Sequence, residues 1–307
     1  MPASESVLIE VRPGRIRTAL MQEDRLVDLI VSDESSPSLV GNIYLGRVES
    51  VLDNLNAAFI DIGIGRSGFL AMAEARPAGV PGDRSDKISK YIHEGEKVVV
   101  QVLRDGVEDK GPKLTIRMAL TARSVILTPD DPAIRISRRI DDADERARLE
   151  KLLKDFAEEN EGFIVRTAAE KAINQDILSD AEGLREAYNA IEVARDTGTS
   201  PSVLHQEPDG VLRALRDIVP EQVAAIEVDD IDAYRQAKDY LDKHASGLKG
   251  RLSHYRDATP MFEREDVADD LDKAMQAEVT LPSGGTIIFS DTPALVAIDV
   301  NTKGSVK

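Results

Sequence analysis

The chain of 307 residues contains no cysteine. Without thiols it can form no disulfide framework, no thiolate zinc site and no cysteine nucleophile, and this composition is typical of a reducing compartment. The first residues lack the basic start and apolar core of a signal peptide, and no apolar run is long enough to cross a membrane. We therefore expect a cytoplasmic protein with no membrane partner.

Basic residues are few for a protein that would bind nucleic acid. Lys and Arg total 39 against 56 Asp and Glu, so the formal net charge is −17. This acidity weighs against nucleic-acid binding, which depends on cations that neutralise phosphates. The acids concentrate at 141–159 and 263–272, a pattern typical of solvated helix faces. Any RNA site must therefore be local and salt-sensitive, and an acidic scaffold for protein partners is the non-RNA alternative.

The signatures of several common enzyme classes are also missing. The four histidines form no metal-type pair such as HExxH; they are His93, His205, His244 and His254. Neither a Walker loop nor GxGxxG follows an expected strand, and the GxSxG elbow of serine hydrolases is absent. These chemistries therefore fit the chain poorly.

Hydrophobic patterning predicts an α+β multidomain protein. Apolar residues alternate through the first 30 residues, with Pro13 and Gly14 as a turn, which indicates a small antiparallel sheet. Five short β runs with glycine at the bends follow between Val40 and Leu120, and they favour a small barrel of OB type.

Helical periodicity begins after the expected barrel. The spacing predicts an amphipathic helix over 142–160, then two helices over 168–178 and 181–195. The segment 197–201 (TGTSP) is typical of a linker. Helices and strands then alternate as far as an acidic helix at 263–277.

The chain closes with an expected β-hairpin whose last run, Ala294–Val300, is almost wholly apolar and should be buried on both faces. Asp299 lies in this run, and a buried carboxylate must be paired, hydrogen-bonded or bound to a metal. Asn301 falls on the same face of an extended strand, so the two could converge on a hard cation such as Mg²⁺. The alternative is that both simply cap the next turn.

Two phenylalanines mark a candidate RNA-binding face on the barrel. Phe59 and Phe69 lie on neighbouring expected strands, separated by a glycine-rich turn at 61–68. Basic residues accompany them: Arg47, Arg66, Arg104 and Lys110. Aromatic and basic side chains on such a face stack bases and follow the phosphate backbone, whereas the alternative is core packing of two phenylalanines.

A short apolar strand ends at Arg166 and Thr167. A guanidinium and a hydroxyl offered together match a phosphate monoester. The alternative is a surface arginine followed by a threonine that caps a helix.

Taken in order, these segments resemble the ribonuclease E/G family over the whole chain. The segments 41–46 (GNIYLG) and 57–63 (AAFIDIG) resemble its S1-type RNA-binding barrel. The segments 137–140 (SRRI) and 164–168 (IVRTA) resemble its 5′-sensing region, and 281–301 resembles the start of its nuclease subdomain.

The resemblance implies a particular domain order. An RNase H-like domain, residues 1–38 and 208–273, would be interrupted by an S1-type OB-fold domain at 39–123 and a 5′-sensor region at 124–207. Residues 274–307 would begin a DNase I-like catalytic subdomain that is incomplete in this chain.

The resemblance also implies an Mg²⁺-dependent endoribonuclease that cuts single-stranded RNA during RNA processing and decay. Asp299 would bind the metal, and Asn301 would lie beside it at the catalytic centre. The family's second catalytic aspartate would fall beyond Lys307. An RNA-binding or regulatory family member with little or no nuclease activity is the alternative function.

Further roles follow from the same resemblance. A preference for 5′-monophosphorylated substrates would depend on Arg166 and Thr167, with Arg138 in the same pocket. Single-stranded RNA would lie on the barrel, held by Phe59, Phe69, Arg104 and Lys110. Because the zinc link of larger family members needs cysteine, a zinc-linked tetramer is not expected, and a homodimer is compatible with the sequence.

Overall fold

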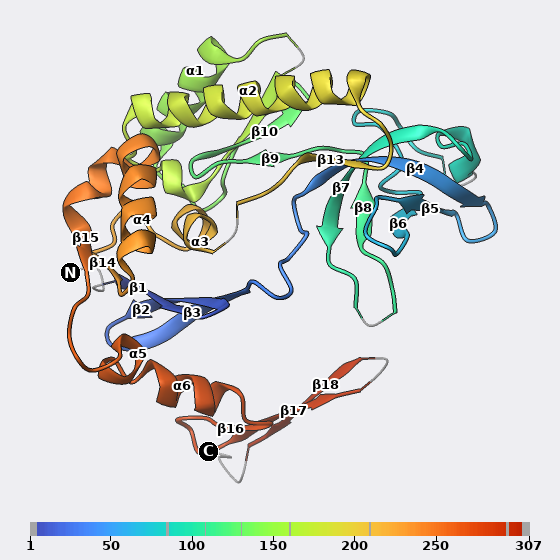
Figure 1. Ribbon diagram of the computed structural model, residues 1–307. Coiled ribbons are helices and arrows are strands. Elements are labelled where there is room, and N and C mark those ends of the chain that lie inside the picture. The colour runs from blue at the N-terminus through green and yellow to red at the C-terminus, as the bar shows by residue number, and fades with distance from the viewer. Residues whose placement is uncertain are drawn as a thin grey trace.

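The computed structural model describes residues 5–83, 86–107, 109–129, 131–159, 161–208, 210–292 and 295–302. Four sheets and their helices form the fold of these residues, as Figure 1 shows. Within the described ranges, no helix is long and apolar enough to span a membrane.

The first sheet joins the start of the chain to a segment about 200 residues later. Its order is β15-β14-β1-β2-β3, with antiparallel β1–β3 and parallel β14 and β15. The strands are β1 (Glu5–Arg12), β2 (Arg15–Gln22), β3 (Arg25–Asp33), β14 (Ala225–Val228) and β15 (Leu252–His254). The sheet predicted at the N-terminus is therefore confirmed, and distant strands extend it.

Helices cover both faces of this sheet because its apolar residues alternate between them. Val7 and Ile9 pack with α3 (Val211–Asp217) and α4 (Ile231–His244), whereas Leu8 packs on the opposite face with α5 and α6. The expected acidic helix at 263–277 is instead two short helices, α5 (Met261–Arg264) and α6 (Val267–Ala274). Asp266 separates them with a left-handed φ of 53°, which an α-helix cannot contain.

The second sheet is the closed five-stranded barrel that the sequence predicted. Neighbouring strands run in the order β4-β5-β6-β8-β7, and pairing of β7 with β4 closes the barrel. The strands are β4 (Ile43–Leu52), β5 (Ala57–Asp61), β6 (Gly68–Ala71), β7 (Lys97–Arg104) and β8 (Lys113–Thr115). The 3₁₀-helix η1 (Ile88–Lys90) packs beside it, and β13 (Ser202–His205) adds to the free edge of β4.

A third body, the sheet ordered β11-β12-β10-β9, follows the barrel in the chain, and Figure 1 shows it beside the barrel. Its strands are β9 (Leu120–Thr121), β10 (Val125–Pro129), β11 (Ile134–Ile136) and β12 (Glu161–Val165), with helices α1 (Ala143–Phe156), η2 (Thr167–Ala169) and α2 (Asn174–Thr197). Figure 1 shows α2 running from the side of α4 to the barrel. This long helix therefore links the three bodies.

The prediction of two helices at 168–178 and 181–195 is wrong, because α2 continues through Asp180. Asp180 is buried, and its carboxylate accepts hydrogen bonds from the Ser124 backbone N–H at 2.8 Å and the Ser124 hydroxyl at 2.7 Å. His244 Nδ1 at the end of α4 lies 2.7 Å from the same carboxylate. The sequence pattern suggested a break in the helix at Asp180. In the structure the carboxylate of this residue instead binds Ser124 and His244 from within a continuous helix.

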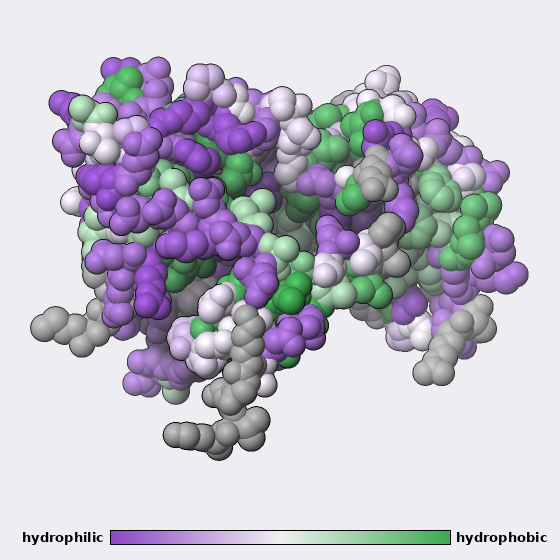
Figure 2. Space-filling view, turned by 90° about the horizontal axis from the view of Figure 1, so that it is seen from below, coloured by the Kyte–Doolittle hydropathy of each residue, from purple (hydrophilic) through white to green (hydrophobic). Residues whose placement is uncertain are grey.

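The last three strands form a small separate sheet, β16 (Glu278–Thr280), β17 (Thr286–Asp291) and β18 (Val296–Asn301). The sequence predicted that Ala294–Val300 would be buried. Ala294 lies outside the described residues, and for residues 295–300 the prediction is wrong because all six are exposed. Val296, Ile298 and Val300 are 59%, 60% and 58% exposed. Their apolar character predicted burial, but burial needs a second layer, and the main contacts of β18 within the described chain are with β17. Figure 2 views the molecule from the side on which this sheet lies.

Replacement of Asp180 by alanine should lower the free energy of unfolding by about 3 kcal/mol, because the Ser124 donors and His244 lose a buried partner together. Urea denaturation checks this against Asp239→Ala, which removes an exposed carboxylate from α4 and should change the value by less than about 0.5 kcal/mol. Equal effects of the two substitutions would contradict a structural role for Asp180.

Candidate functional site

One face of the barrel carries two aromatic and two basic residues on adjacent strands, which we call the barrel row: Phe59, Phe69, Lys113 and Arg104. Phe59 on β5 pairs with Phe69 on β6, and their rings contact edge to face with centroids 5.9 Å apart. Phe69 is also in register with Lys113 on β8, which pairs with Arg104 on β7. Because paired residues point to one side of a sheet, the four side chains share a face. Phe69 is 36% exposed and Arg104 is exposed, so this face is open to solvent.

Lys110 lies on the loop between β7 and β8 and is exposed. The same loop packs against the glycine-rich turn between the two phenylalanine strands, where a β-carbon on Gly111 would collide with the backbone oxygen of Ser67. Only glycine permits this approach. The loop that carries Lys110 is therefore held against the turn that separates Phe59 from Phe69.

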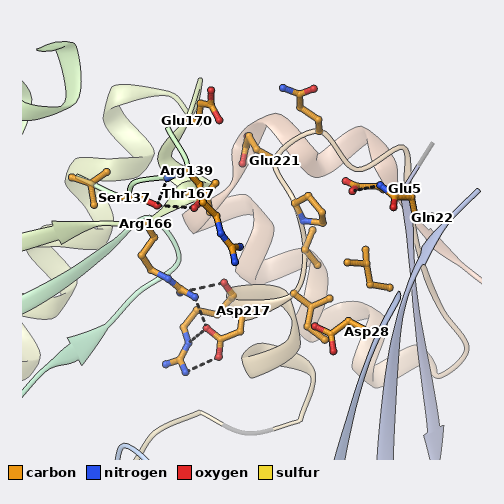
Figure 3. A pocket seen from close by; sticks show the side chains of 18 of the residues that line it. Glu5, Gln22, Asp28, Ser137, Arg139, Arg166, Thr167, Glu170, Asp217 and Glu221 are labelled. Carbon is orange, nitrogen blue, oxygen red and sulfur yellow. Dashed lines mark hydrogen bonds and ion pairs between the residues drawn. The ribbon is translucent and has the colours of Figure 1, made fainter. Parts of the chain in front are cut away.

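A cavity of about 850 Å³ lies between the third sheet and the first sheet. Figure 3 shows its two walls, with Ser137, Arg139, Arg166 and Thr167 on one side and Glu5, Gln22 and Asp28 on the other. The first wall is built where β11 and β12 end, so backbone pairing of these parallel strands brings the turn at 137–139 next to 166–167. The cavity is thus a joint feature of two bodies distant in sequence.

The polar wall presents hydroxyl and guanidinium groups together. The Ser137 and Thr167 hydroxyl oxygens are 3.0 Å apart, and Arg139 lines the cavity beside them. Arg138 is exposed on the same turn but does not line the cavity. Hydroxyls and guanidinium groups are donors suited to a phosphate.

The Arg166 side chain is held by protein partners on both of its terminal nitrogens. One donates to the Ala122 carbonyl at 2.7 Å, and the other donates to the Asp217 carboxylate at 2.9 Å. Asp217 also accepts two hydrogen bonds from Arg216, at 3.1 and 3.0 Å. The arginine is therefore oriented before any ligand arrives, and one carboxylate holds two guanidinium groups.

Asp217 remains ionised in this arrangement. Burial raises the pKa of its carboxyl, but the hydrogen bonds and charge of Arg216, with the charge of Arg166, outweigh that effect, so the pKa lies below its ordinary value. The whole cavity is not cationic, because three arginines and five carboxylates line it. Attraction for an anion must therefore come from the wall that carries Arg139 and Arg166.

Asp299 and Asn301 lie on the exposed strand β18, where the Asn301 amide donates to the Asp299 carboxylate at 2.9 Å. They share a face, as expected, but Asp299 is exposed, so the argument that burial forces it to bind a metal does not hold. Within the described parts of the chain, no three His, Asp or Glu side chains gather in a way that could hold a metal ion. The pair offers a carboxylate and an amide oxygen, which could supply part of a Mg²⁺ shell alongside water and phosphate oxygens.

Three residues that build these surfaces were not singled out from the sequence: Lys113, Arg216 and Asp217. Ser137 and Arg139 lie in the segment 137–140 that resembles the 5′-sensing region, but only Arg138 of that segment was given a role. Lys113 had a usable signal, since it opens a β run after the loop that carries Lys110. Asp217 had none, because its partner Arg166 is 51 residues away.

Comparison with known proteins gives one consistent result. The model of the ribonuclease E/G family matches residues 119–307. Ribonuclease G of Salmonella typhimurium (strain SL1344) is 31% identical over 303 residues, an alignment that covers 96% of this chain and 62% of that protein. Ribonuclease E of Haemophilus influenzae is 33% identical over 298 residues and is covered to 32%. The chain thus spans less than two thirds of the length of these relatives.

Structural comparison adds little. The solution structure of GSP13 from Bacillus subtilis is 26% identical, with 25% of this chain and 54% of GSP13 covered, but the TM-score is 0.21.

The low pKa of Asp217 makes stability depend on pH in a defined direction. A carboxyl with a depressed pKa stabilises the fold above its unfolded pKa, about 3.9, and loses that contribution as the pH falls through the folded value. We expect the stability advantage of the wild type over Asp217→Asn to be constant above about pH 5 and to shrink below about pH 4.

Urea denaturation between pH 3 and 7 measures this difference, with exposed Asp239→Asn as the control substitution. A difference between wild type and Asp217→Asn that grows towards acid would contradict the assigned ion pairs.

Proposed function

This chain belongs to the ribonuclease E/G family, and we propose that it is the RNA-binding and catalytic part of a cytoplasmic, Mg²⁺-dependent endoribonuclease. Its substrate would be single-stranded RNA, with a preference for a 5′-monophosphate, in RNA processing and decay. The observation that carries this proposal is the wall of hydroxyl and guanidinium groups at Ser137, Arg139, Arg166 and Thr167, found in a chain of this family.

The barrel row is suited to single strands rather than duplexes. Phe59 and Phe69 offer ring surface to unstacked bases, and stacking on an aromatic side chain contributes about 1–3 kcal/mol per base. Arg104 and Lys110 are exposed and would neutralise the phosphates between those bases. Lys113, whose ammonium group lies 3.4 Å from the Glu74 carboxylate, would exchange that partner for a phosphate. This local set of cations would allow a chain of net charge −17 to bind RNA.

The cavity wall is suited to a terminal phosphate. A phosphate monoester carries about −1.5 to −2 charge at pH 7 and three acceptor oxygens, whereas a phosphodiester carries a single charge. Arg139 and Arg166 would supply cationic donors, and the Ser137 and Thr167 hydroxyls would supply neutral ones. An RNA with a 5′-hydroxyl end would leave these donors without a phosphate partner. The missing hydrogen bonds and ion pairs would make the protein prefer RNA with a 5′-monophosphate.

Asp299 would hold the metal, and Asn301 would orient its carboxylate through the amide hydrogen bond. When bound, Mg²⁺ supplies an activated water and positive charge for the scissile phosphate. The exposure of Asp299 leaves room for an RNA strand at this position.

The domain assignment is part of the proposal. Because β14 and β15 complete the sheet begun by β1–β3, residues 1–38 and 208–273 are assigned to one RNase H-like domain. The closed barrel supports an S1-type domain at 39–123. On the family resemblance, the third sheet apart from β9 is assigned to a 5′ sensor at 124–207, and the last sheet is assigned to the start of a DNase I-like subdomain at 274–307.

Asp299→Asn in the protein at its full natural length should lower the cleavage rate by at least about 100-fold while RNA affinity stays unchanged, because it removes charge from the metal site and nothing from the barrel. The assay is cleavage of single-stranded RNA in Mg²⁺. Asp291→Asn, an exposed aspartate on neighbouring β17, should cut at the wild-type rate.

RNA binding without cleavage by the wild type would favour the regulatory alternative. Unchanged cleavage by Asp299→Asn would remove this residue from the catalytic centre.

A further inference from the structure

The hairpin of β1 and β2 carries three arginines on one face of the first sheet. Arg12 and Arg15 are paired across the hairpin, and Arg17 is paired with Glu10. Because paired residues and residues two positions apart point to the same side of a sheet, these four side chains share a face. We call Arg12, Arg15 and Arg17 the arginine hairpin. They line a second cavity, of about 540 Å³, at the end of the first sheet.

Two arginines of this hairpin pair with carboxylates that are more buried than the guanidinium groups. The Glu10 side chain is 1% exposed and accepts hydrogen bonds from Arg12 at 2.5 Å and from Arg17 at 2.8 Å. Asp229 is 12% exposed and accepts a further bond from Arg12 at 2.7 Å. The Arg12 side chain, in contrast, is 41% exposed. A ligand that arrives from solvent therefore meets guanidinium groups before it meets these two carboxylates.

The third arginine has its partner near the surface instead. The Arg15 side chain is 56% exposed, and it donates to the Asp33 carboxylate at 3.2 Å. Asp33 also accepts hydrogen bonds from the Ser35 hydroxyl at 2.5 Å and the Ser35 backbone N–H at 2.9 Å. A guanidinium has five N–H donors, so Arg15 can bind a second anion while Asp33 keeps its contacts with Ser35.

The face that carries the arginine hairpin is turned towards the last sheet. Leu8 on this face packs with α5 and α6, and the Arg17 guanidinium lies over the Phe262 ring of α5, 4.8 Å from its centre. The chain continues from α6 into β16, and Figure 1 shows α5 and α6 between the first sheet and the last. The cavity is therefore on the side of the first sheet where the chain leads to Asp299.

The same end of the first sheet leads into the barrel. β3 ends at Asp33 and β4 begins at Ile43, so about ten residues connect them and span at most about 35 Å. A strand of RNA that runs from the barrel to Asp299 can pass the arginine hairpin on its way.

The lining of the cavity suits the backbone of RNA rather than its bases. Guanidinium groups bind phosphate oxygens through paired hydrogen bonds. Among the described residues, no aromatic side chain lines this cavity, so it offers no ring on which a base would stack. Contacts to phosphates position a strand but carry no sequence information.

We propose that Arg12, Arg15 and Arg17 form a third RNA contact, which binds the phosphodiester backbone of a single strand between the barrel and the last sheet. This inference rests on the proposed function, because it takes RNA to be the ligand. It adds a site that strengthens the binding of long strands and is indifferent to their sequence and to the group at their 5′ end.

The test compares two fluorescent 5′-hydroxyl oligouridines, a hexamer and a strand of about 20 nucleotides, by fluorescence anisotropy without Mg²⁺ so that neither is cut. Arg15→Gln removes one exposed charge and leaves the pairs of Glu10 intact. It should weaken binding of the long strand about five-fold, as the loss of one exposed charge contact would, and leave the hexamer, which the barrel can hold alone, nearly unchanged.

Salt dependence separates a phosphate contact from a structural role. For the long strand, Arg15→Gln should lower the slope of log affinity against log salt by about 0.7, the value for one phosphate on a single strand. Arg15→Lys keeps the charge and should restore the slope. The matched control is Arg235→Gln, which removes an exposed arginine with one carboxylate partner, Asp232, from α4 on the opposite face of the sheet. It should bind both strands as the wild type does.

The outcomes distinguish this contact from the proposed function. Equal affinity and equal slope for the long strand in the wild type and Arg15→Gln, or an equal loss in Arg235→Gln, would overturn the third contact and leave the barrel and the first cavity standing. Tripolyphosphate binding that Arg15→Gln weakens, with no change for the long strand, would overturn it too and assign the cavity to a free polyphosphate. Failure of the wild type to bind either RNA removes the proposed function, and this contact with it.

Discussion

The Asp217 carboxylate is the contact on which the candidate site depends. It lies between two guanidinium groups, orients Arg166 towards the cavity and connects Arg216 to the rest of the fold. Without this carboxylate, the positive charges of Arg166 and Arg216 would repel each other in a partly buried site. Because the carboxylate stays ionised, the cavity wall can present fixed donors without a net accumulation of positive charge.

This local balance is compatible with the acidity of the chain. A protein of net charge −17 attracts RNA only where several Lys and Arg side chains lie close together and point toward the RNA. Here they are grouped at the barrel row, the wall of the cavity and the arginine hairpin. The surrounding carboxylates, such as Glu5 and Asp28 on the opposite wall, disfavour phosphates elsewhere in the cavity. In the proposed function, specificity for position would therefore come from the same acidity that weakens general binding.

The local features of the fold could be predicted from the sequence, and the distant ones could not. Strand alternation and bend glycines predicted the closed barrel, and the turn at 61–68 predicted that Phe59 and Phe69 would be neighbours. The burial of β18 was wrong because apolar composition reports a tendency, whereas burial also requires a covering layer. Asp180 and Asp217 were missed because their partners are 56 and 51 residues away, at separations that no local pattern encodes.

Hydrogen exchange with bound RNA tests most directly whether the barrel and the cavity serve one substrate. Two RNA decamers of the same sequence, one with a 5′-monophosphate and one with a 5′-hydroxyl, would be compared at equal occupancy. We predict that both protect β5 and β6, and that only the monophosphate protects the segments 137–139 and 166–167. Equal protection of those segments by both decamers, or protection of neither segment by the monophosphate, would contradict the account.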